Sequence, residues 1–266
     1  MIKFSVYFTV LVILSSCQSN ERVVVKDEYK KFYDNYNLEG SFALFDANSN
    51  ETVLVNESQF HQEFSPASTF KICNSLIGIE TQVIKDKNFV IKWDSTKHSR
   101  PAWNQDQTLQ MAYKNSTVWY YQELARRVGK EKMNYWLKKS LYGNMDTAGG
   151  IDKFWLSGAL RITPSQQIDF LKRLNNYELP FKKESINEVK QIMIAKDTLG
   201  CLIRAKTGWN DNDSAMVGWY VGYIEKGNKT YYFVNCVQTK NKNHEKFAEA
   251  RINITYQILE ELKILK

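Results

Sequence analysis

The sequence predicts an α+β fold of three layers (α/β/α), in which an antiparallel sheet is flanked by helices and carries an inserted helical region. Alternating apolar and polar residues near both ends of the chain, at 39–55 and at 199–239, are typical of strands. The residues between them show mostly helical patterns, and an amphipathic segment closes the chain. Because strands need partners, those from the two ends are expected to join in one sheet with helices on its faces.

Length and composition indicate a globular protein of one large domain or two small ones. The chain has 266 residues, of which 43% are apolar and 14% aromatic, too many for a disordered protein. The net charge of +7 comes from Lys and Arg spread among acids, without a basic aromatic module, so no nucleic-acid partner is expected. The three histidines, His61, His98 and His244, lack metal-ligand spacing, so no metal site and no Ser-His-Asp triad is expected.

The first residues have the features of a secretion signal. Lys3 precedes an apolar stretch, 4–14, that is short for a membrane span, and Leu14-Ser15-Ser16-Cys17 matches the processing box of bacterial lipoproteins. We therefore expect a lipoprotein signal peptide at 1–16, lipidation of Cys17, and a polar tether at 17–36. The protein would act on the periplasmic side of the bacterial envelope, anchored to the membrane only through that lipid. An ordinary signal peptide with an incidental Cys17 is the alternative.

One domain is expected at 37–266, with its sheet part at about 37–62 and 196–266 and its helical part at about 63–195. The first strand covers 39–47 and, after a turn at 48–50, pairs with 51–55 as a hairpin. The helical part begins with a buried helix after Pro66, for which Ser65 is the expected cap. Amphipathic helices follow at 120–128 and 130–139, and another helix runs from Thr163 to Leu174.

The remaining strands follow from residue 199. The segment 199–206 is expected to be a strand that ends at Thr207-Gly208, and the strands 215–225 and 230–239 form a hairpin around Gly227-Asn228. A helix over 245–265 closes the chain. Three cysteines fall at apolar positions of a helix and two strands, so buried free thiols are expected, with one disulfide as the alternative. They are Cys73, Cys201 and Cys236.

The segment Ser68-Thr69-Phe70-Lys71 has the clearest chemical meaning. A serine three residues before a lysine on a helix places the hydroxyl and the amine on the same face, one turn apart. Serine needs a base within hydrogen-bond reach to act as a nucleophile, and lysine can be that base only if its amine is neutral. The apolar residues after the motif predict a core helix, where a lysine would lose its charge. Ser68 and Lys71 are therefore candidate catalytic residues.

Four further short motifs follow. Each has an ordinary interpretation by itself, as a helix cap, a turn, a core tryptophan or a strand end, but chance is a much poorer explanation for all four in this order. They are Ser116-Thr117-Val118, Tyr142-Gly143-Asn144, Trp155-Leu156-Ser157-Gly158 and Lys206-Thr207-Gly208.

With these motifs, the chain resembles serine β-lactamases and penicillin-binding proteins, and within them a class D (oxacillinase, OXA-type) β-lactamase. Similar segments at 101–104 and 122–127 extend the resemblance to nearly the whole chain after residue 38, although Cys73 replaces the proline that many members carry there. The resemblance implies hydrolysis of the β-lactam ring of penicillin-type antibiotics, and thus resistance to them, through an acyl-enzyme on Ser68. It also implies that carbon dioxide carboxylates Lys71 and that no other cofactor is used.

The same resemblance implies roles for the residues around this pair. The carbamate on Lys71 would act as general base, in an apolar setting provided by Phe70, Val118 and Trp155, whose indole N–H could also bind it. Ser116, aided by Lys206, would pass a proton to the leaving nitrogen.

Substrate binding is implied for residues of the last strands and the last helix. The backbone N–H groups of Ser68 and Trp209 would form the oxyanion hole, and Thr207 and Arg251 would bind the substrate carboxylate. The substrate-binding set is Thr207, Gly208, Trp209 and Arg251, and the residues expected to shape the site are Tyr142 and Asn144.

Other functions fit the sequence less well than hydrolysis does. A non-hydrolytic β-lactam sensor normally follows several transmembrane helices, whereas this chain has one short hydrophobic segment. A penicillin-binding protein of wall synthesis is less compatible with Phe70 and the Trp155 motif, and a class A enzyme would need a Glu-x-x-Leu-Asn motif, which is absent. A purely structural lipoprotein would leave the ordered motifs unexplained. The sequence makes no prediction of substrate spectrum or oligomeric state.

Overall fold

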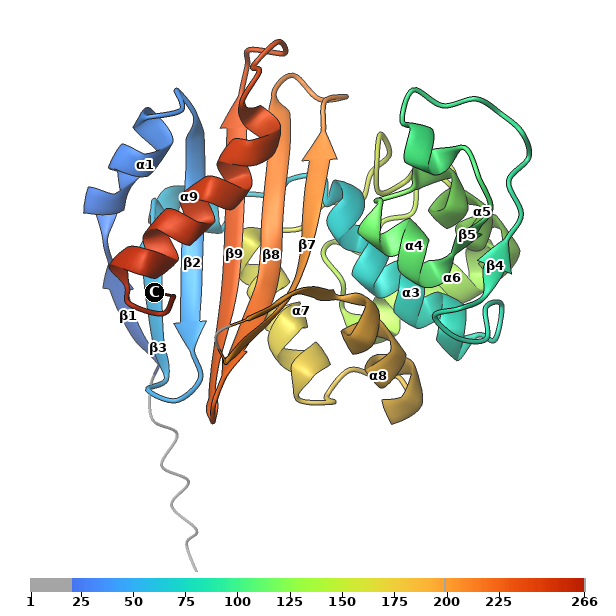
Figure 1. Ribbon diagram of the computed structural model, residues 1–266, viewed down its shortest axis with the longest axis horizontal. Coiled ribbons are helices and arrows are strands. Elements are labelled where there is room, and N and C mark those ends of the chain that lie inside the picture. Colours follow the sequence, from blue (N-terminus) through green and yellow to red (C-terminus); the bar gives the residue numbers. More distant parts are fainter. Residues whose placement is uncertain (1–20, 199, 266) are drawn as a thin grey trace, which may run out of the picture.

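In the computed structural model, which describes residues 21–198 and 200–265, seven strands form the central sheet in the order β1-β3-β2-β9-β8-β7-β6 (Figure 1). These strands are β1 (Arg22–Val25), β2 (Glu39–Asp46), β3 (Glu51–Val55), β6 (Ile194–Thr198), β7 (Cys201–Asn210), β8 (Met216–Lys226) and β9 (Lys229–Thr239). Two short strands, β4 (Val90–Ile91) and β5 (Gln107–Thr108), pair separately within the helical region.

Helices cover both faces of the sheet, which gives the three layers. On one face α9 (Phe247–Glu261) packs on β8 and β9 and contacts α1 (Lys31–Asp34), while α7 (Pro164–Asn175) packs on the other face (Figure 1). The helical region is continuous with the helical layer that contains α7. It contains α3 (Lys71–Glu80), α4 (Leu109–Lys114), α5 (Val118–Val128), α6 (Lys130–Ser140) and α8 (Lys183–Ile192), with α2 (Glu57–Phe60) before it; the 3₁₀ turns are η1 (Asp27–Lys30), η2 (Ala67–Phe70) and η3 (Pro101–Trp103).

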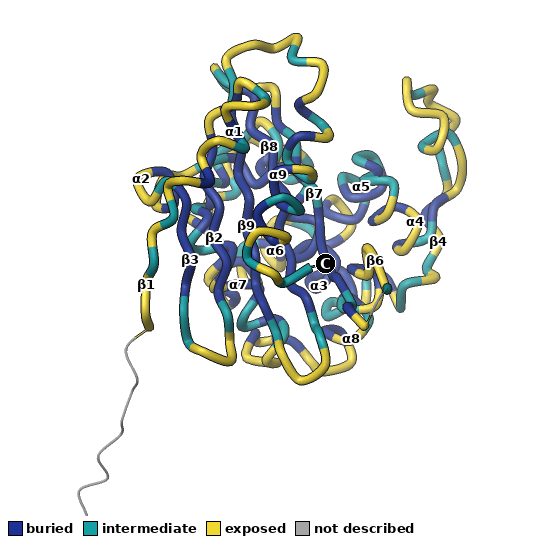
Figure 2. The backbone as a smooth tube through the Cα atoms, turned by 60° about the vertical axis from the view of Figure 1, so that its left-hand side comes forward, coloured by how far each residue is buried: buried dark blue, intermediate teal, exposed yellow. Residues whose placement is uncertain are grey.

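The strands between the edge strands β1 and β6 are buried on both faces because alternate residues enter two different cores. In β9, Phe233 packs toward α9, whereas its neighbour Val234 packs into the larger core shared with the helical region. Figure 2 shows the central strands among the most buried parts of the backbone, and every residue of α3 except the last is buried. Full burial of each large apolar side chain contributes about 1.5–3 kcal/mol, which explains why the sheet and α3 form a fixed frame for the motifs.

The predicted fold class is confirmed, but the sheet is mixed rather than purely antiparallel. β1 pairs in parallel with β3, while the other ladders of the sheet are antiparallel. The two hairpins agree with their predicted ranges to within one residue. The strand predicted to end at Thr207-Gly208 instead continues to Asn210, because β8 pairs with it along its whole length, as far as Asn210 with Val217.

The prediction of a polar tether at 17–36 is wrong for the part that the structure describes. Residues 22–36 contain β1, η1 and α1, and the domain therefore begins near residue 22. Tyr29 and Tyr33, one helical turn apart, are buried in the core under α9, and the Tyr33 hydroxyl donates a 2.8 Å hydrogen bond to Oδ1 of Asn235. Because charged residues lie between the two tyrosines, the sequence pattern did not reveal this apolar face. The predicted signal peptide and Cys17 lie outside the described residues.

Two local predictions at the motif helix have different outcomes. Ser65 does not cap it, since its Oγ donates instead to the backbone carbonyls of Trp155 and Leu156 at 3.1 and 3.2 Å. Cys73, Cys201 and Cys236 are buried free thiols, as expected. Within 21–198 and 200–265, no helix has both the length and the apolarity needed to cross a bilayer.

Candidate active site

The first motif lies where a 3₁₀ turn passes into an α-helix. Ser68 belongs to η2, and Lys71 is the first residue of α3, so the two side chains point the same way. Lys71 Nζ donates a 2.8 Å hydrogen bond to Ser68 Oγ. Ala67, immediately before the serine, has a left-handed φ of 47°, which non-glycine residues rarely adopt and which is often found next to functional groups.

Lys71 is buried without a counter-ion. Its side chain is fully inaccessible to solvent, and none of the ion pairs of the described residues includes it. Its ammonium lies 5.1 Å from the centre of the Tyr121 ring. Burial, and secondarily the positive charge of Arg100, lowers the pKa of Lys71 to about 7. The amine is therefore neutral in a substantial fraction of molecules near neutral pH.

An aromatic cluster packs behind the motif. The ring of Phe70 lies 5.3 Å from Trp155, 5.1 Å from Phe154 and 5.5 Å from Tyr142, measured between centroids. The indole N–H of Trp155 is buried and has no hydrogen-bond partner among the residues that the structure describes. A buried donor without a partner costs about 1–3 kcal/mol, so this N–H fits a group that accepts from it. A carbamate on Lys71 would bring such an acceptor into this cluster.

The second serine, Ser116, is paired with Lys206, the lysine of the last motif. Ser116 lies between α4 and α5, and its φ of 54° is again left-handed. Lys206 Nζ donates to Ser116 Oγ at 3.1 Å and to the carbonyl of Thr207 at 3.0 Å. Burial, followed by the charges of Lys71, Arg251 and Arg100, holds the pKa of Lys206 well below its ordinary value. Lys206 can therefore give up a proton more readily than an exposed lysine.

The two serines lie on one cleft with a volume of about 290 Å³. It brings together residues from five separate parts of the chain: Ser68, Arg100, Trp103, Ser116, Val118, Thr207, Gly208, Trp209, Asp211 and Arg251. The absence of a side chain at Gly208 allows β7 to approach η2, since a Cβ there would lie 3.1 Å from the carbonyl of Pro66 and from Cγ2 of Thr69. This close approach places the backbone of Trp209 beside the Ser68 segment, as the predicted oxyanion hole requires.

Arg251 enters the cleft from α9. Its Nη1 donates to the carbonyl of Gly208 and its Nε donates to the carbonyl of Ala248, while its guanidinium lies 5.8 Å from the Trp209 ring. These contacts position the guanidinium and leave Nη2 available for a ligand. Burial, and secondarily Arg100, lowers the pKa of Arg251 to about 10, so it remains charged at neutral pH.

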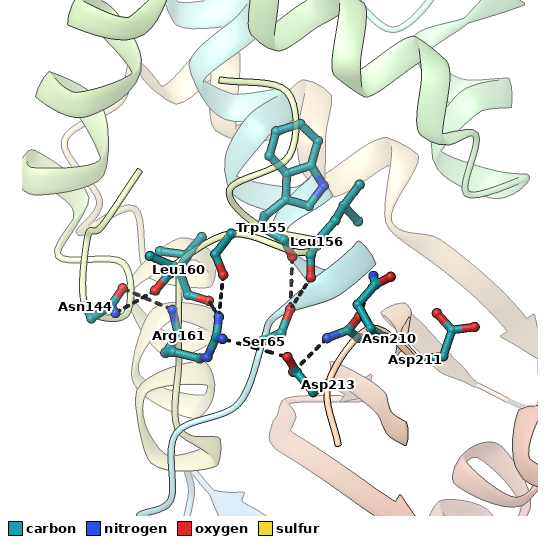
Figure 3. A network of polar contacts seen from close by, with 12 residues as sticks. Ser65, Asn144, Trp155, Leu156, Leu160, Arg161, Asn210, Asp211 and Asp213 are labelled. Atoms are coloured by element: carbon teal, nitrogen blue, oxygen red, sulfur yellow. Dashed lines mark hydrogen bonds and ion pairs between the residues drawn. The ribbon is translucent and has the colours of Figure 1, made fainter. Parts of the chain in front are cut away.

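Tyr142 and Asn144 do not line the cleft; their contacts support residues behind it. Tyr142 is buried between Phe70 and Phe170. The side chain of Asn144 accepts from the backbone N–H of Arg161 at 3.0 Å and donates to the carbonyl of Ala159 at 2.9 Å (Figure 3). These contacts close the loop that carries Trp155, whose indole points away from the polar network in Figure 3.

The same network joins that loop to the loop after β7. Arg161 donates to the carbonyls of Gly158 and Leu160 at 2.7 and 2.9 Å, and its Nη2 lies 3.9 Å from Oδ1 of Asp213 (Figure 3). Asn210 donates to the other oxygen of Asp213 at 2.8 Å. The loop that carries Trp155 and the loop after β7 are thus connected.

Sequence reasoning gave no site role to four residues. Trp103 lines the cleft and lies in the 101–104 segment, which was noted only for its resemblance. Tyr121, which faces the Lys71 ammonium, lies in a helix that was predicted only from its periodicity. Arg100 and Asp211 line the cleft but belong to loops without a motif. No sequence signal identifies them, because only the fold brings those loops to the cleft. Among the described residues, no group of His, Cys, Asp and Glu side chains could hold a metal ion.

Comparisons with known proteins agree with this geometry. Residues 29–260 match the family model described as the penicillin binding protein transpeptidase domain. The chain is 35% identical over 249 residues to the β-lactamase OXA-20 of Pseudomonas aeruginosa, covering 92% of each protein. The solved structure of the class D β-lactamase YbXI from Nostoc is 39% identical, with a TM-score of 0.86, and the match covers 90% of this chain and all of that one.

A relative with a different role also matches. The regulatory protein BlaR1 of Bacillus licheniformis is 33% identical over 217 residues, which are 81% of this chain but 36% of that protein. Matches to enzymes and to this regulator span the same domain. From its family match, its relatives and its fold, the chain belongs to the penicillin-binding protein transpeptidase family and, within it, to the class D β-lactamases.

Proposed function

We propose that this protein hydrolyses the β-lactam ring of penicillin-type antibiotics through an acyl-enzyme on Ser68 and thereby gives resistance to them. The observation that carries the proposal is the contact between Ser68 and a fully buried Lys71 without a counter-ion. A lysine in this setting is suited to proton transfer rather than to a structural ion pair.

We further propose that Lys71 is carboxylated. A neutral amine adds to carbon dioxide, forming an N–C bond and releasing one proton, and the lowered pKa of Lys71 makes the neutral amine available. Trp155 would donate its unpaired indole N–H to the new group, and Phe70 and Val118 would limit its contact with water. When present, the carbamate supplies an anionic oxygen that can accept a proton, which a protonated lysine cannot do.

In the acylation step, Ser68 Oγ bonds to the β-lactam carbonyl carbon while its proton leaves toward the Lys71 side chain. The N–H groups of Ser68 and Trp209 donate to the carbonyl oxygen as it gains negative charge. The carbon–nitrogen bond of the ring breaks, and the nitrogen takes a proton from the Ser116 hydroxyl, which regains one from Lys206 across the 3.1 Å contact. Water then adds to the ester, releasing Ser68 and the ring-opened acid.

The substrate carboxylate would bind between Thr207 and Arg251. Both line the cleft, and the positioned guanidinium of Arg251 presents a free Nη2 there. Arginine suits a carboxylate because its planar N–H donors match the two oxygens.

Turnover separates this proposal from a sensor that is acylated and remains so. A chromogenic cephalosporin is mixed with the enzyme, with and without bicarbonate, and compared with Ser68→Ala. Continuous hydrolysis that bicarbonate increases, and that Ser68→Ala abolishes, supports the proposal. A single equivalent of product followed by no further hydrolysis would contradict it and favour a non-hydrolytic β-lactam sensor.

We also propose that the protein is lipidated on Cys17 and acts on the periplasmic side of the bacterial envelope. The support is the lipoprotein box in the sequence. Metabolic labelling with a fatty acid, followed by membrane fractionation, tests it. Label in the wild type that is absent from Cys17→Ser is expected, and an unlabelled wild type would contradict the lipid anchor.

A further inference from the structure

A second guanidinium faces the cleft besides that of Arg251. Arg100 lines the cleft with Ser68 and Ser116, and its side chain is exposed to solvent. No carboxylate in the described part of the chain forms an ion pair with it. Arg100 is therefore a cleft-lining cation whose hydrogen-bond donors are available to a ligand.

Arg100 is held in place by the turn that follows it. Its guanidinium lies 5.2 Å from the ring of Trp103, the last residue of η3. Trp103 donates its indole N–H to the carbonyl of Asn115 at 3.0 Å, and its own carbonyl accepts from the indole of Trp119 at 2.9 Å. The turn is thus fixed between the loop before Ser116 and helix α5, and the stacked guanidinium loses less freedom when a ligand binds.

The charge of Arg100 acts on the interior of the cleft. It contributes to the lowered pKa values of Lys71, Lys206 and Arg251, so it lies close enough to affect all three cations. Asp211 is the carboxylate among the residues lining the cleft. An anionic group of a ligand would relieve this excess of positive charge.

We propose that Arg100 selects β-lactams that carry a second acidic group, in addition to the carboxylate common to the class. This inference rests on the proposed function, in which Arg251 and Thr207 bind the common carboxylate. Arg100 would pair with the second acid, located either on the acyl side chain or on the substituent of a cephalosporin ring. Because Arg100 is exposed, the pair would be screened by salt and its effect would be moderate.

Matched pairs of substrates isolate the second charge. Carbenicillin differs from benzylpenicillin by one side-chain carboxylate, and cefonicid differs from cefamandole by a sulfonate on the methyl group of the tetrazole. For each compound the second-order rate constant of Ser68 acylation is measured, by stopped flow or by mass spectrometry of the acyl-enzyme. This quantity needs no turnover, so it tests the role of Arg100 even in a protein that acylates without hydrolysis.

The comparison uses Arg100→Gln, with Lys97→Gln as the control. Lys97 is an exposed cation three residues earlier that does not line the cleft. In at least one pair, Arg100→Gln should lower the dianionic-to-monoanionic ratio of rate constants by roughly two- to fivefold at low salt, the size expected of one exposed ion pair. Lys97→Gln should leave the ratio at its wild-type value, and added salt should reduce the difference.

Any general effect of Arg100 on Lys71 changes both rate constants of a substrate pair by the same factor. It therefore cancels in the dianionic-to-monoanionic ratio. If Arg100→Gln lowers both members of both pairs by the same factor, Arg100 acts on the common carboxylate or on the base, and the inference is wrong. An equal change in Lys97→Gln would also overturn it, because net charge would then explain the effect. If no compound acylates Ser68, the proposed function fails together with the inference; continued acylation with unchanged ratios overturns the inference alone.

Discussion

Lys71 Nζ lies 2.8 Å from Ser68 Oγ, at a position where no part of the lysine is accessible to solvent. The nucleophile is thus in contact with an amine that burial makes easy to deprotonate. If Lys71 is carboxylated as proposed, this relationship would connect the pH dependence of the enzyme to the occupancy of the carbamate.

We expect activity to fall reversibly as the pH drops below about 7. The pKa of Lys71 is lowered, so the neutral amine predominates above that value, and each pH unit below it reduces the neutral fraction about tenfold. Enzyme kept at pH 5 in buffer free of carbon dioxide should therefore show a lag when returned to pH 7.5. Bicarbonate should shorten the lag, measured as hydrolysis of a chromogenic cephalosporin. Immediate full activity without bicarbonate would exclude a carbamate as the base.

Trp155→Phe should clearly lower the fraction of Lys71 that carries a carbamate, while it changes the free energy of unfolding only a little. Phenylalanine retains an aromatic ring beside Phe70 and Phe154 but lacks the indole N–H, for which the described part of the chain offers no acceptor. Carbon-13 NMR of enzyme equilibrated with labelled bicarbonate measures occupancy, and high bicarbonate should restore part of the turnover. Trp136→Phe is the control, since Trp136 stacks on Phe181 away from the cleft. Wild-type occupancy in Trp155→Phe would show that the indole is not a ligand of the carbamate.

Tyr33→Phe should lower the free energy of unfolding, because the segment 22–36 is part of the folded domain. The change leaves Oδ1 of Asn235 buried without its 2.8 Å donor, which costs about 1–3 kcal/mol. For a domain of this size, each kcal/mol corresponds to roughly 2–4 °C in Tm. Tyr36→Phe is the matched control, since the Tyr36 hydroxyl accepts a 3.2 Å bond from Asn253 at the surface. Equal thermal unfolding of the two variants would contradict a structural role for this segment.

The parts of the fold that could be predicted were those specified by local pattern. The β8–β9 hairpin and the helices α5 to α7 follow from alternation, amphipathic spacing and the turn residues between them. The segment 22–36 could not be predicted, because the contact of Tyr33 with Asn235 joins residues 202 positions apart. The parallel β1–β3 pair was missed for the same reason.

The residues of the site also differ in whether local sequence or tertiary structure brings them together. Ser68 and Lys71 are close in sequence, so helix geometry alone places them together. Ser116 and Lys206 were identified by their motifs, and the 3.1 Å contact between them depends on tertiary structure. Arg100 belongs to no motif, and its stacking on the nearby Trp103 does not place it at the site, so its position in the cleft became visible only in the folded chain.

Arg251→Ala should weaken substrate capture much more than it slows the later chemistry. The guanidinium is fixed by the carbonyls of Gly208 and Ala248, so its loss removes a positioned partner for the substrate carboxylate. Hydrogen bonds to charged groups contribute about 1.5–3 kcal/mol, which predicts a fall in kcat/KM of roughly tenfold or more, mainly through KM. Arg22→Ala, which removes an exposed arginine at the far edge of the sheet, should retain wild-type kinetics. If KM is unchanged in Arg251→Ala, the carboxylate binds elsewhere, and Arg100 becomes the first residue to test as its partner.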